Sequence, residues 1–145
     1  MINAVIDITD ALSFLEGMHP ASLRVISNVV GRATKGIYSG AFANLSGGGA
    51  LSRKKYGWLY KGRYPVPVVT GHLRRALYFV LPGRSKGDFS AGPLEGVVYN
   101  AASYGWAIHE GRGSMSGRPY LSDAAQNVLG SLDTFASQEL DKEFR

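Results

Sequence analysis

The sequence predicts an α+β fold: N-terminal helices and a long C-terminal helix packed around a small antiparallel β-sheet, with extended loop arms. Three observations predict it. Apolar residues recur at helical spacing near both ends of the chain. Two β-prone runs in the middle flank a glycine-rich turn. The length of 145 residues suits a single domain, 1–145, that buries about two thirds of its unfolded surface.

The composition narrows the class of protein. Hydrophobic residues make up 45% of the chain, yet no run approaches the ~20 apolar residues of a membrane-spanning helix. The first residues include acids and no base, unlike a secretory signal peptide. The chain has no cysteine, which excludes disulfides and thiol chemistry and fits a reducing compartment. We therefore expect synthesis in a cytoplasm and no membrane partner.

Charge is distributed unevenly along the chain, whose formal net charge is +5. Residues 51–86 contain nine Lys or Arg and no Asp or Glu, whereas acids outnumber bases after Pro119. Such polarity suits nucleic acid on the basic half, or copies of the chain that meet basic to acidic. The charges alone leave both interpretations open.

Two helices are predicted before residue 46. Asp7 and Asp10 suit the start of a short helix over residues 8–16, and Gly17 ends it. Pro20 begins a longer helix of about five turns. Its apolar stripe repeats every three or four residues, as expected of a core helix: Leu23, Ile26, Val30, Ala33, Ile37 and Ala41.

Three glycines in this helix, Gly31, Gly36 and Gly40, each lower its intrinsic helicity by roughly 1 kcal/mol relative to alanine. Either packing overrides that cost, or the small residues permit close contact with another helix. A partner-binding helix is the alternative to a core helix.

A flexible break at residues 46–49 leads into a basic aromatic arm, residues 51–67. Its basic residues alternate with aromatic ones: Arg53, Lys54, Lys55, Tyr56, Trp58, Tyr60, Lys61 and Arg63. Aromatic rings that stack on bases and cations that meet phosphates would make it a nucleic-acid surface. An extended arm whose aromatic face packs on a neighbouring subunit explains the same residues, and so does a solvated loop.

A short helix and two strands follow the arm. Thr70 is a good N-cap for a helix of about two turns that places Leu73, Ala76 and Leu77 on one face. Residues 78–81 and 94–99 are β-prone and suggest an antiparallel pair. The glycine-rich turn at 83–87 lacks the Gly-Lys-Ser/Thr of a phosphate loop, so we interpret it as a surface turn.

The last third of the chain contains two further predicted helices. Tyr104, Ala107 and Ile108 share a helical face before Gly111, and residues 112–117 form a flexible loop. Pro119 then begins a helix of about six turns, residues 120–144, whose stripe would cover the sheet. We expect Tyr104, Ile108, Pro119 and Leu121 in the core, and the loop free to meet a neighbouring subunit.

The sequence contains no complete catalytic or metal-binding motif among those considered. His109-Glu110 begins like the zinc protease signature, but the second histidine it needs would be at position 113, which is Gly. No Gly-x-Ser-x-Gly elbow is present, and no spacing pairs Glu95 with Asp123 or Glu110. We expect no enzyme, no cofactor and no metal. Glu110 would accept hydrogen bonds from the loop backbone or pair with Arg112 or Arg118.

Three motifs in order resemble the neck and tail-completion proteins of tailed bacteriophages, often described as minor tail components. The first is Thr70-Gly71-x-Leu73-Arg74, the second Tyr104-x-x-x-Ile108-x-Glu110-Gly111, and the third Arg118-Pro119-Tyr120-Leu121. The chain departs from the family pattern in three ways: Gly111 follows Glu110 directly, Tyr120 replaces phenylalanine, and the arm at 51–67 is long.

The resemblance implies a non-catalytic virion protein that forms a ring, commonly a hexamer, at the head–tail junction. Its partners would be other copies of the chain, neighbouring neck and tail-tube proteins and, non-specifically, passing DNA. Subunit contacts are expected from the arm and from Arg112, Ser114, Met115, Asp141 and Glu143. The alternative function is a basic nucleic-acid-binding protein that uses residues 53–63.

Overall fold

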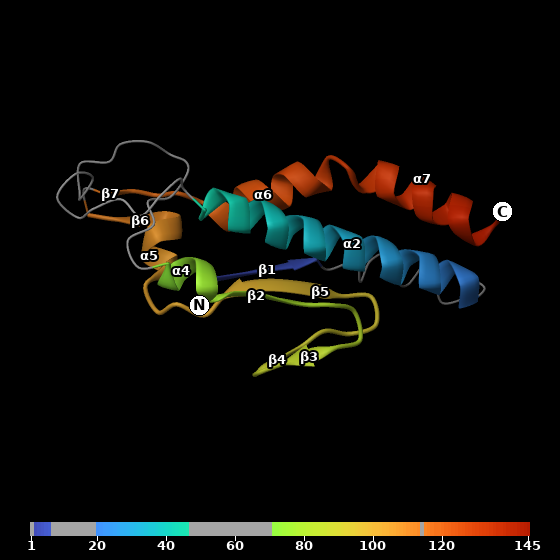
Figure 1. Cartoon of the computed structure of the whole chain (residues 1–145), viewed down its shortest axis with the longest axis horizontal. Coiled ribbons are helices and arrows are strands. Elements are labelled where there is room, and N and C mark those ends of the chain that lie inside the picture. The colour runs from blue at the N-terminus through green and yellow to red at the C-terminus, as the bar shows by residue number, and fades with distance from the viewer. Residues whose placement is uncertain (1, 7–19, 47–70, 114) are drawn as a thin grey trace.

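A computed structural model of the chain describes residues 2–6, 20–46, 71–113 and 115–145. It is α+β, as predicted, and its elements form layers: the long helix α2 lies between the sheet and the C-terminal helices α6 and α7 (Figure 1). The helices are α2 (Pro20–Asn44), α4 (His72–Arg75), α5 (Gly105–Glu110), α6 (Tyr120–Leu129) and α7 (Leu132–Glu143). The strands are β1 (Ile2–Ile6), β2 (Leu77–Val80), β3 (Ser85–Lys86), β4 (Phe89–Ser90), β5 (Gly96–Asn100), β6 (Gly111–Arg112) and β7 (Met115–Ser116).

The main sheet is antiparallel and has the order β1-β5-β2. The predicted pairing of the two middle strands is confirmed, with Leu77 opposite Asn100 and Val80 opposite Val97. Strand β1 pairs with the other edge of β5, from Ile2 opposite Asn100 onward. Strand β1 was not predicted from the sequence, although its run of five residues, rich in β-branched types, is typical of a short strand.

The two faces of the sheet are covered differently. Leu77 and Val98 face α2 and join a core cluster with Ile37 and Ala41. The opposite face carries Val80, Val97 and Tyr99, over which the small hairpin β3–β4 folds. The Phe89 ring stacks on the Tyr99 ring at 4.1 Å between centroids. The predicted surface turn therefore contains a hairpin that shields the second face.

The predicted long helix is confirmed as α2, but only part of its predicted buried face is correct. Val30, Ala33, Ile37 and Ala41 are buried, as the stripe requires. Leu23 is instead 39% exposed, because the first turns of α2 are rotated so that Ala21 and Val25 point inward. At the N-terminal end of α2, the predicted buried face is therefore displaced around the helix axis by a fraction of a turn from the observed one.

The glycines of α2 allow close helix contact, which is the second of the two explanations considered above. A Cβ built on Gly36 would lie 3.1 Å from Val128, and one on Gly40 would lie 3.2 Å from the Cβ of Ala124. Both partners belong to α6. Because neither glycine has a side chain, α2 and α6 pack backbone close to backbone.

The single long C-terminal helix predicted above is wrong, because two helices replace it. Gly130 and Ser131 separate α6 from α7, and glycine has low helix propensity while serine favours helix starts. The prediction that this segment covers the sheet is also only partly right. Tyr120 and Leu121 of α6 reach the core cluster with Leu77, but α7 packs along α2 (Figure 1).

Three smaller predictions also need correction. Helix α4 is a single turn, shorter than expected, because Leu77 already belongs to β2. Tyr104 is 42% exposed instead of being in the core. The ends of the loop at 112–117 are not free: Arg112 pairs with Met115, and Gly111 with Ser116, as the antiparallel strands β6 and β7.

Several predicted features lie outside the described residues: the helix at 8–16, the glycine break at 47–49, the arm at 51–67, Thr70 and Ser114. Within the described part of the chain, no helix is long and apolar enough to cross a membrane.

Candidate functional site

The three sequence motifs meet in space at one end of the molecule, where α4, β5, α5 and α6 converge (Figure 1). Asn100, at the end of β5, is fully buried and links them. Its Nδ2 donates to the Leu73 carbonyl at 2.8 Å, and its Oδ1 accepts from the Ala102 N–H at 2.9 Å. A Cβ on Gly105 would lie 3.4 Å from both Asn100 Oδ1 and the Tyr120 hydroxyl. We call this assembly the junction.

Glycines of the motifs fit this junction for conformational reasons. Gly71 precedes α4 with φ 69° and Gly111 follows α5 with φ 87°, both in the region that favours glycine. Gly117 packs so tightly that an added Cβ would lie 2.6 Å from the Glu110 carbonyl oxygen. The Arg118 N–H then donates to the Ile108 carbonyl at 2.9 Å, which fixes the start of α6 against α5.

Tyr120 is the largest fully buried side chain of the junction. Its ring meets the His109 ring edge-on at 5.4 Å between centroids. Its hydroxyl has no hydrogen-bond partner among the described residues. Burial raises the pKa of Tyr120 above its ordinary value, and the nearby Tyr104 adds to the rise.

A polar chain of three side chains crosses the junction: Glu110, His109 and Ser122. Glu110 Oε1 lies 2.6 Å from His109 Nδ1, and the Ser122 hydroxyl lies 3.1 Å from His109 Nε2. The order carboxylate, imidazole, hydroxyl is that of a nucleophilic triad. This arrangement was not predicted from the sequence, because His109 and Ser122 are separated in the sequence and form no motif.

The surroundings of His109 favour a structural role for these three side chains. Nε2 also accepts the backbone N–H of Ser122 at 3.4 Å, so the imidazole satisfies a donor in the first turn of α6. The His109 ring is only 6% exposed and packs against Tyr120. Glu110 pairs with the adjacent His109, a partner that was not considered from the sequence. His109 thus links α5 to the first turn of α6, and Glu110 holds the His109 ring from its other nitrogen.

Exposed aromatic and basic side chains surround the junction on the outside. Tyr104 and Trp106 are 42% and 44% exposed, with the Arg112 guanidinium 5.9 Å from the Trp106 ring. The Arg74 guanidinium lies 5.4 Å from the Phe42 ring on the neighbouring α2. We call this surface the aromatic end; Trp106 and Phe42 were not singled out from the sequence.

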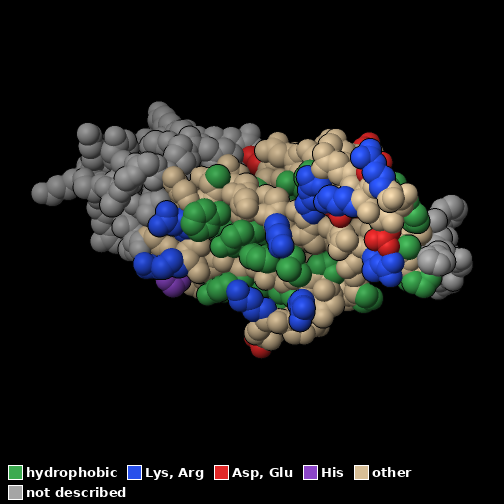
Figure 2. Space-filling model, turned by 45° about the vertical axis from the view of Figure 1, so that its right-hand side comes forward, with side chains coloured by type: hydrophobic (Ala, Val, Ile, Leu, Met, Phe, Trp, Pro, Cys, Tyr) green, Lys and Arg blue, Asp and Glu red, His purple; other side chains and the backbone are tan. Residues whose placement is uncertain are grey.

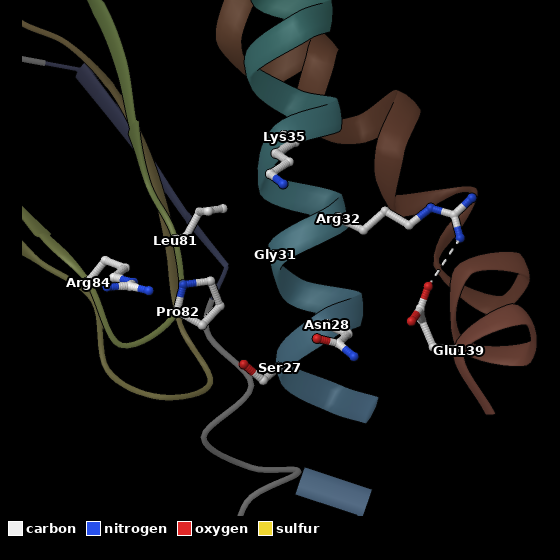
Figure 3. Close-up of a pocket in the computed structure, with 9 residues that line it drawn as sticks. All are labelled: Ser27, Asn28, Gly31, Arg32, Lys35, Leu81, Pro82, Arg84 and Glu139. Atoms are coloured by element: carbon white, nitrogen blue, oxygen red, sulfur yellow. Dashed lines mark ion pairs between the residues drawn. The ribbon is translucent and has the colours of Figure 1, made fainter. Parts of the chain in front are cut away.

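A groove lies away from the junction, on the surface of α2. Its volume is about 560 Å³, and it is lined by residues of α2, of the turn after β2, and of α7: Ser27, Asn28, Gly31, Arg32, Lys35, Leu81, Pro82, Arg84 and Glu139. Figure 3 shows α2 on one side and Leu81, Pro82 and Arg84 on the other. Gly31 lets this wall approach α2 closely, since a Cβ there would already touch Pro82 Cδ at 3.7 Å. We call it the basic groove.

The cations of the basic groove differ in their partners. Arg32 pairs with Glu139 at 3.6 Å, and its guanidinium lies 4.4 Å from the Phe135 ring (Figure 3). Lys35 and Arg84 have no ion pair with any described residue, and both are exposed. The surrounding face carries basic side chains around a central area of hydrophobic ones, with fewer acids (Figure 2). The groove therefore offers two uncompensated positive charges beside an apolar wall.

The predicted contact residues do not gather at one place. Arg112 lies at the aromatic end, whereas Asp141 and Glu143 lie at the opposite end of the molecule (Figure 1). Glu143 pairs with Arg24 of α2, and Asp141 pairs with Arg145 at 3.5 Å. The acidic end of the chain is thus partly compensated within its own molecule. The eight arm residues from Arg53 to Arg63 and Ser114 lie outside the described residues.

No group of three or more metal-ligating side chains occurs among the residues that the structure describes. Comparison with known protein families, curated proteins and solved structures gives no match.

Proposed function

We propose that this chain is a structural virion protein that forms a ring at the head–tail junction of a tailed phage, as a tail terminator or a tail-completion protein. The resemblance of its three ordered motifs to neck and tail-completion proteins is the starting point. Its partners would be further copies of the chain, six in a ring by analogy with that family, and the neighbouring neck and tail-tube proteins.

One observation carries the proposal: residues from three motifs that are far apart in the sequence meet in one buried junction. Leu73 of the first motif, Ile108 of the second and Tyr120 of the third all lie in or against one core cluster. This shared packing site supports the interpretation of the three motifs as one pattern, and with it the family resemblance.

The junction also indicates what the motifs would do in such a protein. His109 accepts the N–H of Ser122 in the first turn of α6, Glu110 pairs with His109, and Gly117 permits the close approach of the third motif to α5. The motif residues would therefore serve to hold the fold together. The aromatic end and the basic groove remain for contacts with other molecules, because exposed aromatic and arginine side chains are enriched in protein interfaces.

The test is to locate the chain in assembled particles. Virions that carry the chain with a small tag at its C-terminus would be imaged by cryo-electron microscopy with a tag-specific label. The expected result is label at the neck, between head and tail, in each particle. Label on the capsid surface, on the tail tip or nowhere in the particle would contradict the proposal.

A second candidate function is binding of nucleic acid, favoured by the run of bases without acids at residues 51–86. Outside this run, the Arg112 guanidinium lies beside the Trp106 ring. In such a pair the ring can stack on a base while the cation contacts a phosphate. Lys54→Ala, Lys55→Ala and Lys61→Ala together would then lower DNA affinity and reduce its salt dependence. Unchanged affinity and an unchanged salt slope would reject this function.

A further inference from the structure

Helix α7 presents two flanks with different chemistry. At about 100° per residue, Phe135 and Glu139 fall on the flank beside α2 and the basic groove. Asp133, Leu140 and Phe144 fall on another flank, at least about 100° from Glu139 around the helix axis. Asp141 follows on the same outer side. We call the surface formed by Asp133, Leu140, Asp141 and Phe144 the acidic flank.

The acidic flank places exposed apolar side chains beside exposed carboxylates. Leu140 is 45% exposed and Phe144 is 63% exposed, and they accompany two exposed carboxylates, Asp133 and Asp141. Among the described residues, Asp141 forms an ion pair only with the exposed Arg145, at 3.5 Å, an arrangement that contributes little in water. A surface that combines large apolar side chains with accessible charges is typical of a contact site.

The basic groove complements this flank in both respects. Lys35 and Arg84 supply two cations without an ion pair in the described chain, opposite the two carboxylates of the flank. Leu81 and Pro82 supply an apolar wall for Leu140 and Phe144. Apolar surface and charge therefore match between the groove and the flank.

We propose that the acidic flank of one copy of this chain binds the basic groove of the next copy. This rests on the proposed ring and identifies the surfaces that would build it. Because groove and flank are different surfaces, one copy can offer its flank to one neighbour and its groove to another, and such head-to-tail contacts close into rings when their rotation permits. The occupant of the groove is thus a second copy of the chain.

Charge reversal tests the pairing directly. The groove variant carries Lys35→Glu and Arg84→Glu, and the flank variant carries Asp133→Lys and Asp141→Lys. Assembly would be measured by sedimentation velocity and native mass over a range of concentrations, with circular dichroism to confirm folding. The wild-type chain is expected to assemble, and each variant should need a concentration roughly tenfold higher or more, because like charges oppose one another.

Restoration is the sharper readout. A chain with all four substitutions, and an equimolar mixture of the two variants, should both recover assembly, because each again places opposite charges face to face. Asp88→Lys, an exposed charge reversal in the turn between β3 and β4, is the matched control and should leave assembly unchanged. Gly31→Leu, which fills the groove without changing charge, should weaken assembly in the wild-type background.

Three outcomes would overturn the inference: a wild-type chain that remains monomeric at every concentration, charge reversals without effect on assembly, or folded variants that the compensating changes do not restore. A groove variant that loses DNA affinity but still assembles would reassign the groove to nucleic acid. The particle imaging above separates the two proposals. Label at the neck with no effect of these variants rejects only the interface, whereas the expected assembly without label at the neck rejects only the location.

Discussion

Helix α2 holds the two C-terminal helices in contrasting ways along its length. Toward its C-terminal end it packs on α6 through small residues, with Gly40 against Ala124 and Gly36 against Val128. Toward its N-terminal end it meets α7 through charged side chains, including the ion pair of Arg24 with Glu143. The first region is close-packed and apolar, and the second is polar and partly exposed.

The difference indicates where the stability of the fold resides. Apolar burial contributes about 25 cal/mol for each Å² removed from water, whereas exposed ion pairs contribute roughly 0 to 1 kcal/mol each. The side chain of Arg24 is 63% exposed, so its pair belongs to the weaker kind. The contact of α2 with α6 and the sheet should therefore carry most of the stability, and the contact with α7 should depend on salt.

The largest expected effect comes from Gly96→Ala, where β5 passes close to α2. A Cβ at Gly96 would lie 1.8 Å from Oγ1 of Thr34, which is fully buried and donates to the Val30 carbonyl at 2.7 Å. Because both the strand and the helix are fixed, we expect a loss of about 3 kcal/mol or more in the free energy of unfolding. Urea denaturation measures it.

Thr34→Ala in the Gly96→Ala background tests the cause, since it removes the atom that clashes. Part of the lost stability should return in the double variant. Wild-type stability of Gly96→Ala alone would mean that α2 and β5 do not approach as closely as described.

Two alanine substitutions in α2 compare a packed glycine with an open one. Gly31→Ala should stabilise by roughly 0.5–1 kcal/mol through helix propensity, since its nearest neighbour would be 3.7 Å away. Gly40→Ala gains the same propensity but meets the Cβ of Ala124 at 3.2 Å, so we expect a net loss of about 1 kcal/mol. Thermal unfolding of both variants compares them. Equal effects would show that α6 does not restrict α2.

Arg32→Ala tests the polar region. It removes the pair with Glu139 at 3.6 Å and the contact of the guanidinium with Phe135 at 4.4 Å. We expect a loss of about 1 kcal/mol at low salt, because the side chain is partly exposed. The loss should shrink in about 1 M salt, where the Debye length is about 3 Å. A loss that is independent of salt would assign the effect to packing of the arginine stem.

Tyr120→Phe should have the smallest effect at neutral pH, within about 0.5 kcal/mol, because the hydroxyl has no partner among the described residues. Burial raises the pKa of Tyr120 in the folded state, so the unfolded chain loses this proton first. The associated stability is present below about pH 10 and is lost as the pH rises above it.

The phenylalanine variant should therefore lose less stability than the wild type above about pH 10. Unfolding measured at pH 7 and again in alkaline buffer provides the comparison. A large loss at pH 7 would reveal a hydrogen bond to the Tyr120 hydroxyl that the described residues do not supply.

Features with a strong local pattern could be predicted from the sequence. The spacing of Ile37 and Ala41 identified the buried face of α2, and the β-prone runs around the central turn identified the pair β2 and β5. Strand β1 was missed because a short run next to acidic residues has little periodicity. The break at Gly130 was missed because the apolar spacing continues across it.

The candidate sites depended on tertiary contacts and so could not be predicted. The basic groove combines side chains from α2, from the turn after β2 and from α7, and Gly31 lets that turn approach α2 closely. The contact of His109 with Ser122 likewise exists only once α5 and α6 are packed. By contrast, the three motifs were visible in the sequence because they lie in short local segments.

The interruption at Gly130 and Ser131 has a consequence for the dynamics of the molecule. It divides the C-terminal segment into one helix anchored by buried Tyr120 and Leu121 and another whose only buried residue is Glu139. Segments with few buried apolar contacts open at lower free energy than the core. Amide hydrogens of α7 should thus exchange with solvent much sooner than those of α6, as one cooperative unit that detaches while the remainder stays folded.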